Sequence, residues 1–195
     1  MRDNKLHNQK GFTMAELLIV VAIIAVLVAI GIPVFNTQLE KSREAYDIYT
    51  MRQAASAAVD LYYSGVHDGT SATTAGLSWS TQANSAAEYN AFGAYDPSTG
   101  QILKDRTSLP ARSKTYGKGS KTNGGTTYVM GSELGAYKAD EDYRNAVVMV
   151  SIYPNASPAY VAVYWKNNIS GNNTYVGGQG NKRNVPKYYL RIDLN

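Results

Sequence analysis

The side chains that most often carry out chemistry are scarce in this chain of 195 residues. It contains no cysteine and two histidines, His7 and His67. Thiol catalysis, disulfide bonds and thiolate metal sites are therefore excluded, and a histidine-based metal site or catalytic triad has few residues from which to form. The acidic cluster at residues 140–142 has a spacing that matches no calcium-binding loop and is typical of a solvated turn. We therefore expect no catalytic residue, no metal and no cofactor.

The carboxylate of Glu16 stands alone at the start of a long apolar segment. Residues 17–35 contain no charged side chain. As a helix they would span about 28 Å, close to the hydrocarbon thickness of a bilayer. An unpaired carboxylate is costly in apolar surroundings, so Glu16 needs a counter-ion or a position from which it reaches the membrane interface.

The residues around Glu16 resemble the N-terminus of type IV prepilins and their pseudopilin relatives. In that family a short basic leader ends in Gly, the mature chain begins with Phe, a Glu follows as the fifth mature residue, and the apolar helix carries a Pro. Here these residues are Gly11, Phe12, Glu16 and Pro33 in GFTMAELLIVVAIIAVLVAIGIPVF. The motif covers about 25 of the 195 residues, and the rest of the chain is a weaker match.

The resemblance implies a processing and assembly pathway. A prepilin peptidase/methyltransferase would cut the leader, residues 1–11, after Gly11 on the cytoplasmic side and N-methylate Phe12. Glu16 would then pair with the amine of Phe12 on a neighbouring subunit, so that the N-terminal helices form a homopolymer. The partners would be membrane lipid before assembly and the pilus assembly machinery, and the chain would move from the cytoplasmic membrane to an extracellular filament on the cell surface.

Two other interpretations of the N-terminus remain open. The apolar core could belong to a secretory signal peptide, with a cleavage site near residues 29–31. It could also be a plain single-pass membrane anchor. In each case the leader, with Arg2, Lys5 and Lys10 against Asp3, is expected on the inside of the membrane.

A single long helix over residues 12–64 is the element expected to position these residues. Its transmembrane half is about residues 17–35, and Gly31 and Pro33 form its weak point, because Pro removes one backbone donor and Gly weakens a helix. A break into two helices at Pro33 is the alternative. In the second half, an apolar stripe follows Ala45, Ile48, Met51, Ala55, Ala58 and Tyr62, and we expect the sheet to contact residues 54–58.

The remaining residues, 65–195, predict a globular head. Residues 65–125 are a variable region that reads as loop with one short helix at 82–91. Residues 126–195 contain strand patterns at 126–130, 146–153, 159–165 and 187–194, with 146–153 central because it is nearly all apolar. The fold class is therefore α+β: a long N-terminal helix packed against an antiparallel sheet of about four strands, with one face of the sheet on the helix and one in water.

Six basic residues gather in the loop 103–125 against a single acid. They are Lys104, Arg106, Arg112, Lys114, Lys118 and Lys121. A solvated, mobile loop is one interpretation, and a surface for nucleic acid or another anion is a second. Without residues 1–11 the chain carries 16 basic and 14 acidic residues, so no strong overall field supports the second interpretation.

The pattern favours a structural subunit, a pilin, of a type IV pilus or pilus-like filament, and no enzyme. The alternatives are a pseudopilin of a type II secretion or competence DNA-uptake system, and a single-span membrane protein with an outer binding domain.

Overall fold

The computed structural model describes residues 11–81, 88–132, 134–168, 174–178 and 186–195. The chain divides into two compact units between Gln38 and Leu39. The first contains the apolar half of a long helix, and the second contains the rest of that helix together with the sheet.

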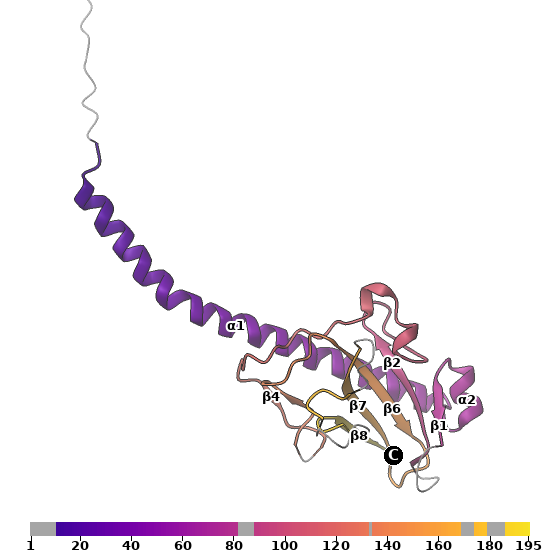
Figure 1. The fold of residues 1–195 in the computed structure, drawn as a ribbon. Helices are drawn as coiled ribbons and strands as arrows, with labels where there is room; N and C mark the ends of the chain where they lie inside the picture. Colours follow the sequence, from indigo (N-terminus) through magenta and orange to yellow (C-terminus); the bar gives the residue numbers. More distant parts are fainter. Residues whose placement is uncertain (1–10, 82–87, 133, 169–173, 179–185) are drawn as a thin grey trace, which may run out of the picture. The chain divides into compact units, whose positions relative to one another are not determined.

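Helix α1 runs without a break from Met14 to Tyr63 (Figure 1). Gly31 and Pro33 both lie inside it, so the two-helix alternative is wrong. The hydroxyl of Thr37 donates a hydrogen bond to the carbonyl of Pro33 at 3.1 Å. The helix stops before Gly65, whose φ of 100° suits a residue without Cβ and lets its amide bond the carbonyl of Tyr62.

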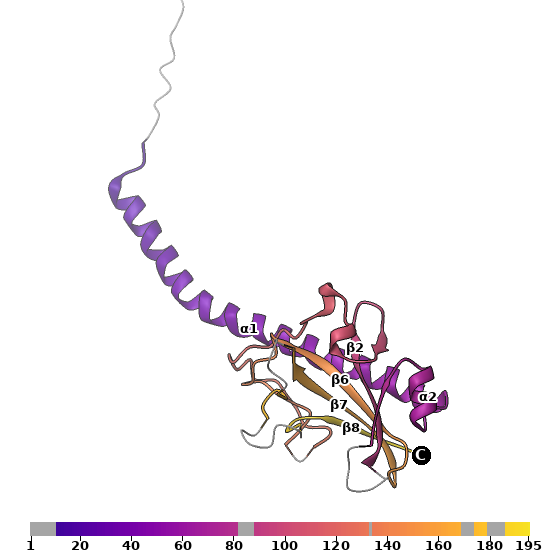
Figure 2. The same cartoon turned by 45° about the vertical axis from the view of Figure 1, so that its right-hand side comes forward.

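The main sheet of the described residues is antiparallel, in the strand order β1-β2-β6-β7-β8, with β3 also paired to β2. Figures 1 and 2 show it lying against the second half of α1. The strands are β1 (Ser78–Ser80), β2 (Asn90–Asp96), β3 (Gln101–Leu103), β6 (Ala146–Tyr153), β7 (Ala159–Asn167) and β8 (Leu190–Leu194). The α+β class, the antiparallel sheet and the central place of residues 146–153 are confirmed, but the count of about four strands is wrong because there are six.

The sequence patterns missed the three strands that come before residue 104. Helix α2 (Gly69–Thr74) and strand β1 were both read as loop. The helix expected at 82–91 is wrong at its end, since Asn90 and Ala91 begin β2, whereas 82–87 lie outside the described residues. Strand β2 is rich in small residues, and Gly93 is needed there because a Cβ would lie 2.4 Å from the carbonyl oxygen of Leu103. Glycine is unfavourable inside a strand, and the close approach of β3 explains why one is present here.

The strand expected at 126–130 is short and belongs elsewhere. Strand β4 (Thr127–Tyr128) pairs with β5 (Tyr137–Lys138) in a separate two-stranded sheet. Between β3 and β4 in the sequence, the region expected to be loop contains two short helices, η2 (Arg106–Ser108) and η3 (Ala111–Ser113).

Both faces of the main sheet carry buried side chains. On one face, the Trp165 ring meets the Tyr143 ring at 5.6 Å, Tyr143 stacks on Tyr137 at 4.1 Å, and the Tyr137 hydroxyl donates to Asp47 of α1 at 3.1 Å. On the other face, Met149, Ser151, Ala162 and Tyr164 are also buried, and stacked rings of Tyr153 and Tyr160 lie on the same side. This face is therefore more buried than expected, although Tyr153, Tyr160 and Arg191 are only half-buried on it and Asp193 is exposed.

The buried stripe of α1 differs from the apolar stripe that the sequence indicates. Ala45 is exposed, and three acids are buried in its place, each no more than 2% exposed: Glu40, Glu44 and Asp47. They continue the line of Met51, Ala54, Ala55 and Ala58, at helical spacing. The contact expected at residues 54–58 is confirmed, but the next two turns toward the N-terminus bury carboxylates instead of apolar side chains.

These three carboxylates, which we call the acid row, accept hydrogen bonds from the backbone of residues 118–126, which we call the strap. The amides of Lys118 and Gly119 donate to Asp47 at 2.8 and 2.7 Å. The amide of Ser120 donates to Glu40. The strap therefore docks on the helix, and the interpretation of this stretch as a mobile, solvated loop is wrong.

Glu44 holds the end of the strap. It accepts from the amides of Gly124 at 2.8 Å and Thr126 at 3.1 Å. A carboxylate that accepts two backbone N–H bonds is stabilised without a cation, which explains how Glu44 and Asp47 can be buried on one helix face, whereas Glu40 accepts one such bond and also pairs with Arg43.

Burial and hydrogen bonding oppose each other in the acid row. Burial raises the pKa of Asp47 to about 6, against hydrogen bonds from Gly119, Lys118 and Tyr137 that lower it. At Glu40 burial also acts to raise the pKa, but the bonds from Ser120 and the Arg43 guanidinium, 3.1 Å away, outweigh it and bring the pKa below its usual value. Asp47 therefore takes up a proton at a higher pH than Glu40 does.

The stability of the head should depend on pH through Asp47. Its pKa is higher in the folded chain than in the unfolded chain, so between about pH 4 and 6 the folded state binds more protons and the contribution of Asp47 falls as the pH rises. The free energy of unfolding of the wild type should exceed that of Asp47→Asn by more at pH 4 than at pH 7. The two differences should themselves differ by roughly 2–3 kcal/mol. Denaturant unfolding of the detergent-solubilised chain at each pH measures it. A matched control is Asp105→Asn, whose pKa is lowered by hydrogen bonds and whose effect should change mainly below pH 4. An advantage that grows from pH 4 to 7 would contradict the assignment.

Gly124→Ala should loosen the strap. A Cβ at this position would lie 2.6 Å from Glu44 Oε2 and 2.8 Å from the backbone nitrogen of Lys41. We expect a loss of about 1–3 kcal/mol in the free energy of unfolding, because the strap must shift and leave Glu44 with fewer donors. Lys121→Ala, in the same strap but exposed, should change it by less than about 0.5 kcal/mol. Equal effects of the two substitutions would count against docking through the acid row.

Candidate functional site

The predicted cut lies between two exposed residues that precede the helix. Gly11 and Phe12 are non-helical and exposed, with the Phe12 side chain 88% exposed. No atom lies within 4 Å of the position that a Cβ on Gly11 would take. The peptide bond between these two residues is therefore open to an enzyme.

Thr13 and Glu16 form a capping box at the start of α1. The Glu16 amide donates to the Thr13 hydroxyl at 3.2 Å, and the Thr13 amide donates to Glu16 Oε2 at 2.8 Å. The Thr13 hydroxyl adds a second bond to the same oxygen at 2.9 Å. The box satisfies amide groups that the first turn of a helix leaves without partners, at the edge of a segment with no polar side chains to satisfy them.

Sequence reasoning missed this local role of Glu16, although its signal is present. Thr13-Met14-Ala15-Glu16 fits the Ser/Thr-x-x-Glu pattern that marks a capping box before an apolar run. Only Oε2 is used in the box, so Oε1 keeps its capacity to accept a further donor.

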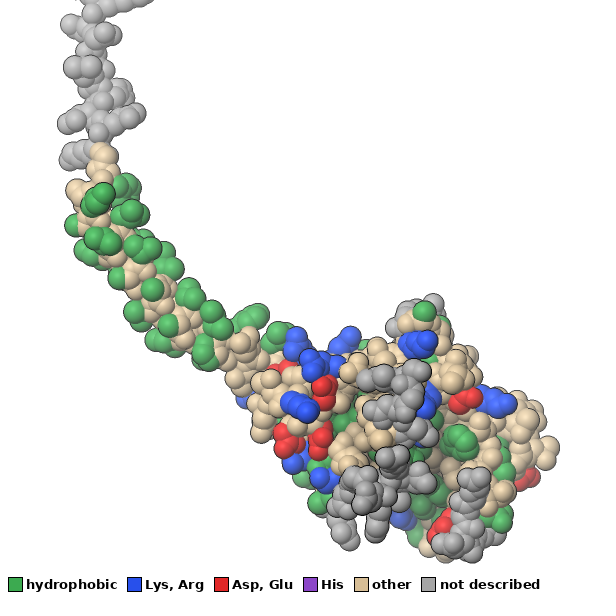
Figure 3. Space-filling model, viewed as in Figure 1, with side chains coloured by type: hydrophobic (Ala, Val, Ile, Leu, Met, Phe, Trp, Pro, Cys, Tyr) green, Lys and Arg blue, Asp and Glu red, His purple; other side chains and the backbone are tan. Residues whose placement is uncertain are grey.

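The apolar half of α1 packs against no other element among the described residues. Residues 17–35 are all exposed, and the large apolar side chains among them are between 48% and 68% exposed. Figure 3 shows the apolar side chains covering this stretch on the face in view. By length and composition, α1 includes a segment able to cross a membrane, near the N-terminus. A surface of this size requires a covering of lipid or of other apolar helices.

Gly31 and Pro33 lie within this uncovered stretch and retain helical structure. A Cβ at Gly31 would meet nothing within 4 Å, so the glycine is not required by packing inside the chain. Unwinding of this segment in a filament stays a prediction.

Four of the six basic residues of the predicted anionic-surface site fall in two neighbourhoods. Near the end of β7, the Arg106 guanidinium donates to the carbonyl of Asn167, and Asn168 donates to the carbonyl of Lys114. In the strap, Lys118 and Lys121 are exposed, and the Lys118 ammonium lies 5.9 Å from the centre of the Tyr46 ring. Lys104 is exposed after β3, and the side chain of Arg112 lies outside the described part of the structure.

Lys166 of β7 lies outside the loop 103–125, so the sequence pattern did not point to it as part of the basic surface. Burial lowers the pKa of Lys166, and the nearby charge of Arg106 lowers it further. Lys166 and Arg106 therefore place two positive charges near each other at the end of β7. A binding function for either neighbourhood stays a prediction.

No group of three or more His, Cys, Asp or Glu side chains in the described ranges is arranged to hold a metal ion. The acid row does not form such a group, since its oxygens point to backbone amides.

Comparison with known proteins adds one match. Residues 6–32 match the family described as the prokaryotic N-terminal methylation motif. No curated protein and no solved structure matches the chain. The matched residues include Gly11, Phe12 and Glu16, on which the resemblance was based, and the match and the apolar helix together fit a membrane-anchored precursor. The chain therefore carries the prepilin-type N-terminal methylation motif of type IV pilin-like and pseudopilin proteins.

Proposed function

We propose that the chain is a structural subunit of a type IV pilus or pilus-like filament. It is made as a membrane prepilin, cleaved after Gly11 and N-methylated at Phe12. The observation that carries this proposal is the apolar half of α1, which overlaps the matched motif and which the described residues leave uncovered. Lipid covers it in the precursor, and the same segment of other subunits covers it in the filament.

The capping box supports a double role for Glu16. Its Oε2 closes the first turn of the helix, while its Oε1 accepts a hydrogen bond from the cationic amine of Phe12 on the neighbouring subunit. The amine arises only after cleavage, so the carboxylate gains its counter-ion only as processed subunits assemble. An ion pair in an apolar medium is strong when both partners are present and costly when one is missing, which makes this contact selective for the correct register.

The size of the head favours a pilin over a pseudopilin. The motif is shared by both kinds of subunit, and neither has a catalytic role. Residues 65–195 form a head of about 130 residues, larger than the small competence type requires. Adhesion, movement, DNA uptake or secretion by the filament would then be driven by other proteins, those of the assembly machinery.

Mass spectrometry of the mature chain tests the processing step. We expect a first residue Phe12 that carries an N-methyl group, because the cut after Gly11 exposes its amine. A mature chain that starts at Met1 would favour a plain membrane anchor. A start at Ile32 would favour a secretory signal peptide.

Two substitutions separate the charge of Glu16 from its capping role. Glu16→Gln keeps a side chain that can complete a capping box but removes the charge, whereas Thr13→Val keeps the charge and removes the box. In a host with the assembly machinery, we expect Glu16→Gln to insert and to be cleaved but to lower filament yield roughly tenfold or more, a loss that corresponds to about 1.4 kcal/mol per tenfold.

Thr13→Val is the matched control for that experiment. It should cost about 1 kcal/mol of helix stability and leave filament yield within a few-fold of the wild type. The reverse order, with normal filaments from Glu16→Gln and few from Thr13→Val, would assign Glu16 to capping alone and remove the pairing role.

A further inference from the structure

Three apolar side chains project into solvent from the tip of the β4–β5 hairpin. Val129 is 78% exposed, Met130 58% and Leu134 54%. We call them the knob. In the described part of the head they are among the most exposed large apolar side chains, and such a group marks a contact surface more often than a random feature.

The knob is fixed in position by backbone contacts. The amide of Ser132 donates to the carbonyl of Tyr189 at 3.0 Å, and its hydroxyl reaches the carbonyls of Gly135 and Lys187 at 2.6 and 3.1 Å. Gly131 has a φ of 123° and approaches so closely that a Cβ would lie 2.1 Å from the carbonyl oxygen of Tyr189. A fixed apolar projection loses little conformational entropy when it binds.

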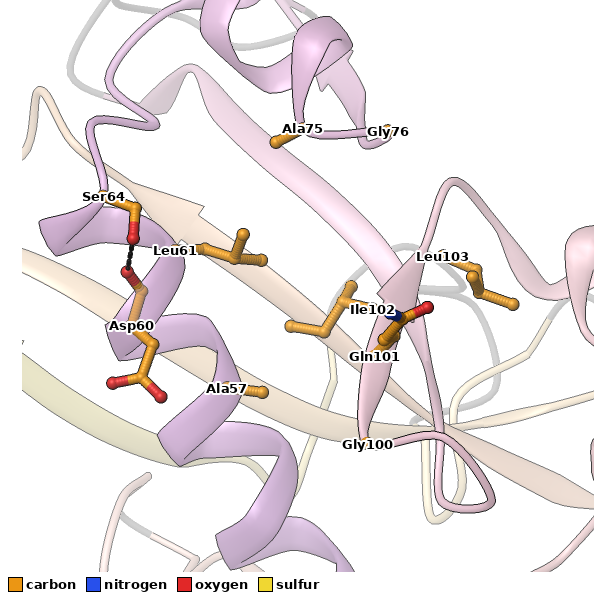
Figure 4. Close-up of a pocket in the computed structure, with 10 residues that line it drawn as sticks. All are labelled: Ala57, Asp60, Leu61, Ser64, Ala75, Gly76, Gly100, Gln101, Ile102 and Leu103. Atoms are coloured by element: carbon orange, nitrogen blue, oxygen red, sulfur yellow. Dashed lines mark hydrogen bonds between the residues drawn. The ribbon is translucent and has the colours of Figure 1, made fainter.

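An open groove of about 480 Å³ lies between the end of α1 and the β2–β3 hairpin. Figure 4 shows Leu61 of α1 and Ile102 of β3 pointing toward one another across it. The other residues that line it are Ala57, Asp60, Ser64, Ala75, Gly76, Gly100, Gln101 and Leu103. Its walls combine apolar and polar groups, with Asp60 as the one charged lining residue.

Knob and groove lie at opposite edges of the main sheet. The knob is bound to residues 187–189, which lead into β8, the last strand at one edge. The groove is bordered by β3, which pairs with β2 at the other edge. With four paired strands between the two features, a chain cannot place its knob in its own groove.

Charges beside the two features are complementary. The Arg52 guanidinium is exposed and lies 4.8 Å from the centre of the Tyr128 ring, at the base of the knob. Asp60, on the groove, is exposed as well. An approaching second copy would bring a cation beside the knob toward an anion beside the groove.

We propose that the knob of one subunit inserts into the groove of the next subunit in the filament. This contact rests on the proposed function, and it adds an interface between neighbouring globular heads to the packing of the apolar helices. Because the two surfaces differ and lie on opposite edges, the contact is heterologous, and repeating it builds an open polymer instead of a closed dimer.

Cysteine cross-linking in assembled filaments tests the contact, since the chain has no cysteine of its own. The double variant Met130→Cys/Gln101→Cys places one thiol on the knob and one on the exposed rim of the groove. Mild oxidation of its filaments should give a ladder of covalent oligomers on a denaturing gel. The matched control Met130→Cys/Asn155→Cys, with the second thiol on the exposed β6–β7 turn, should stay monomeric.

Single variants test the heterologous geometry. Met130→Cys alone should give no covalent dimer, and dimers from it would overturn the proposal by indicating a symmetric contact. Filaments of the double variant without a ladder would overturn the contact while leaving the proposed function intact. A wild-type chain that forms no filament in a competent host would instead overturn the proposed function, and the contact with it.

A charge exchange provides a second measurement that does not depend on cysteines. Arg52→Glu and Asp60→Arg should each lower filament yield several-fold, and the double exchange should restore at least half of the wild-type yield. No recovery in the double exchange, with both single variants defective and the chains still inserted and cleaved, would overturn the proposed pairing of the two surfaces.

Discussion

The constraint on which the structure depends is an apolar helix surface that the chain cannot cover by itself. From residue 17 to residue 35 every side chain of α1 is exposed, and none of them is charged. Exposed apolar area of this extent is unfavourable in water, so the segment exists in lipid or against other apolar helices. The motif at residues 6–32 overlaps most of that surface, and the proposed insertion and assembly would both act through it.

The same helix carries carboxylates in unfavourable surroundings, and all of them are stabilised in the same way. Glu16 at its start and the acid row in its second half each accept hydrogen bonds from backbone amides. At Glu16 the donor belongs to the first turn of the helix itself, and in the acid row the donors belong to the strap, about 80 residues away in sequence at Glu40 and Glu44. Amide donors allow a carboxylate to be buried or to sit at an apolar edge without a permanent cation.

The head is held together without a disulfide bond, and its two edges differ in character. The last strand, β8, pairs with β7 over five residue pairs, and the segment before it binds the hairpin that carries the knob. The opposite edge carries the groove beside α1. Different surfaces at the two edges suit a subunit that meets its neighbours head-to-tail, as an open polymer requires.

The sequence by itself determined the long helix, its apolar half, the prepilin-type motif, and the strands β6 and β7. These are local patterns of apolar residues and spacing, and a local pattern is enough to identify them. Only the tertiary structure decided that Glu40, Glu44 and Asp47 are buried, since their amide donors come from a distant strap and helical periodicity alone places acids toward water. It also decided that Asn90–Asp96 is a strand, because small residues such as Gly93 read as loop until the strand packed against them is known. A sequence pattern predicts the structure of its own segment. Contacts between segments that are distant in the sequence depend on how the whole chain packs.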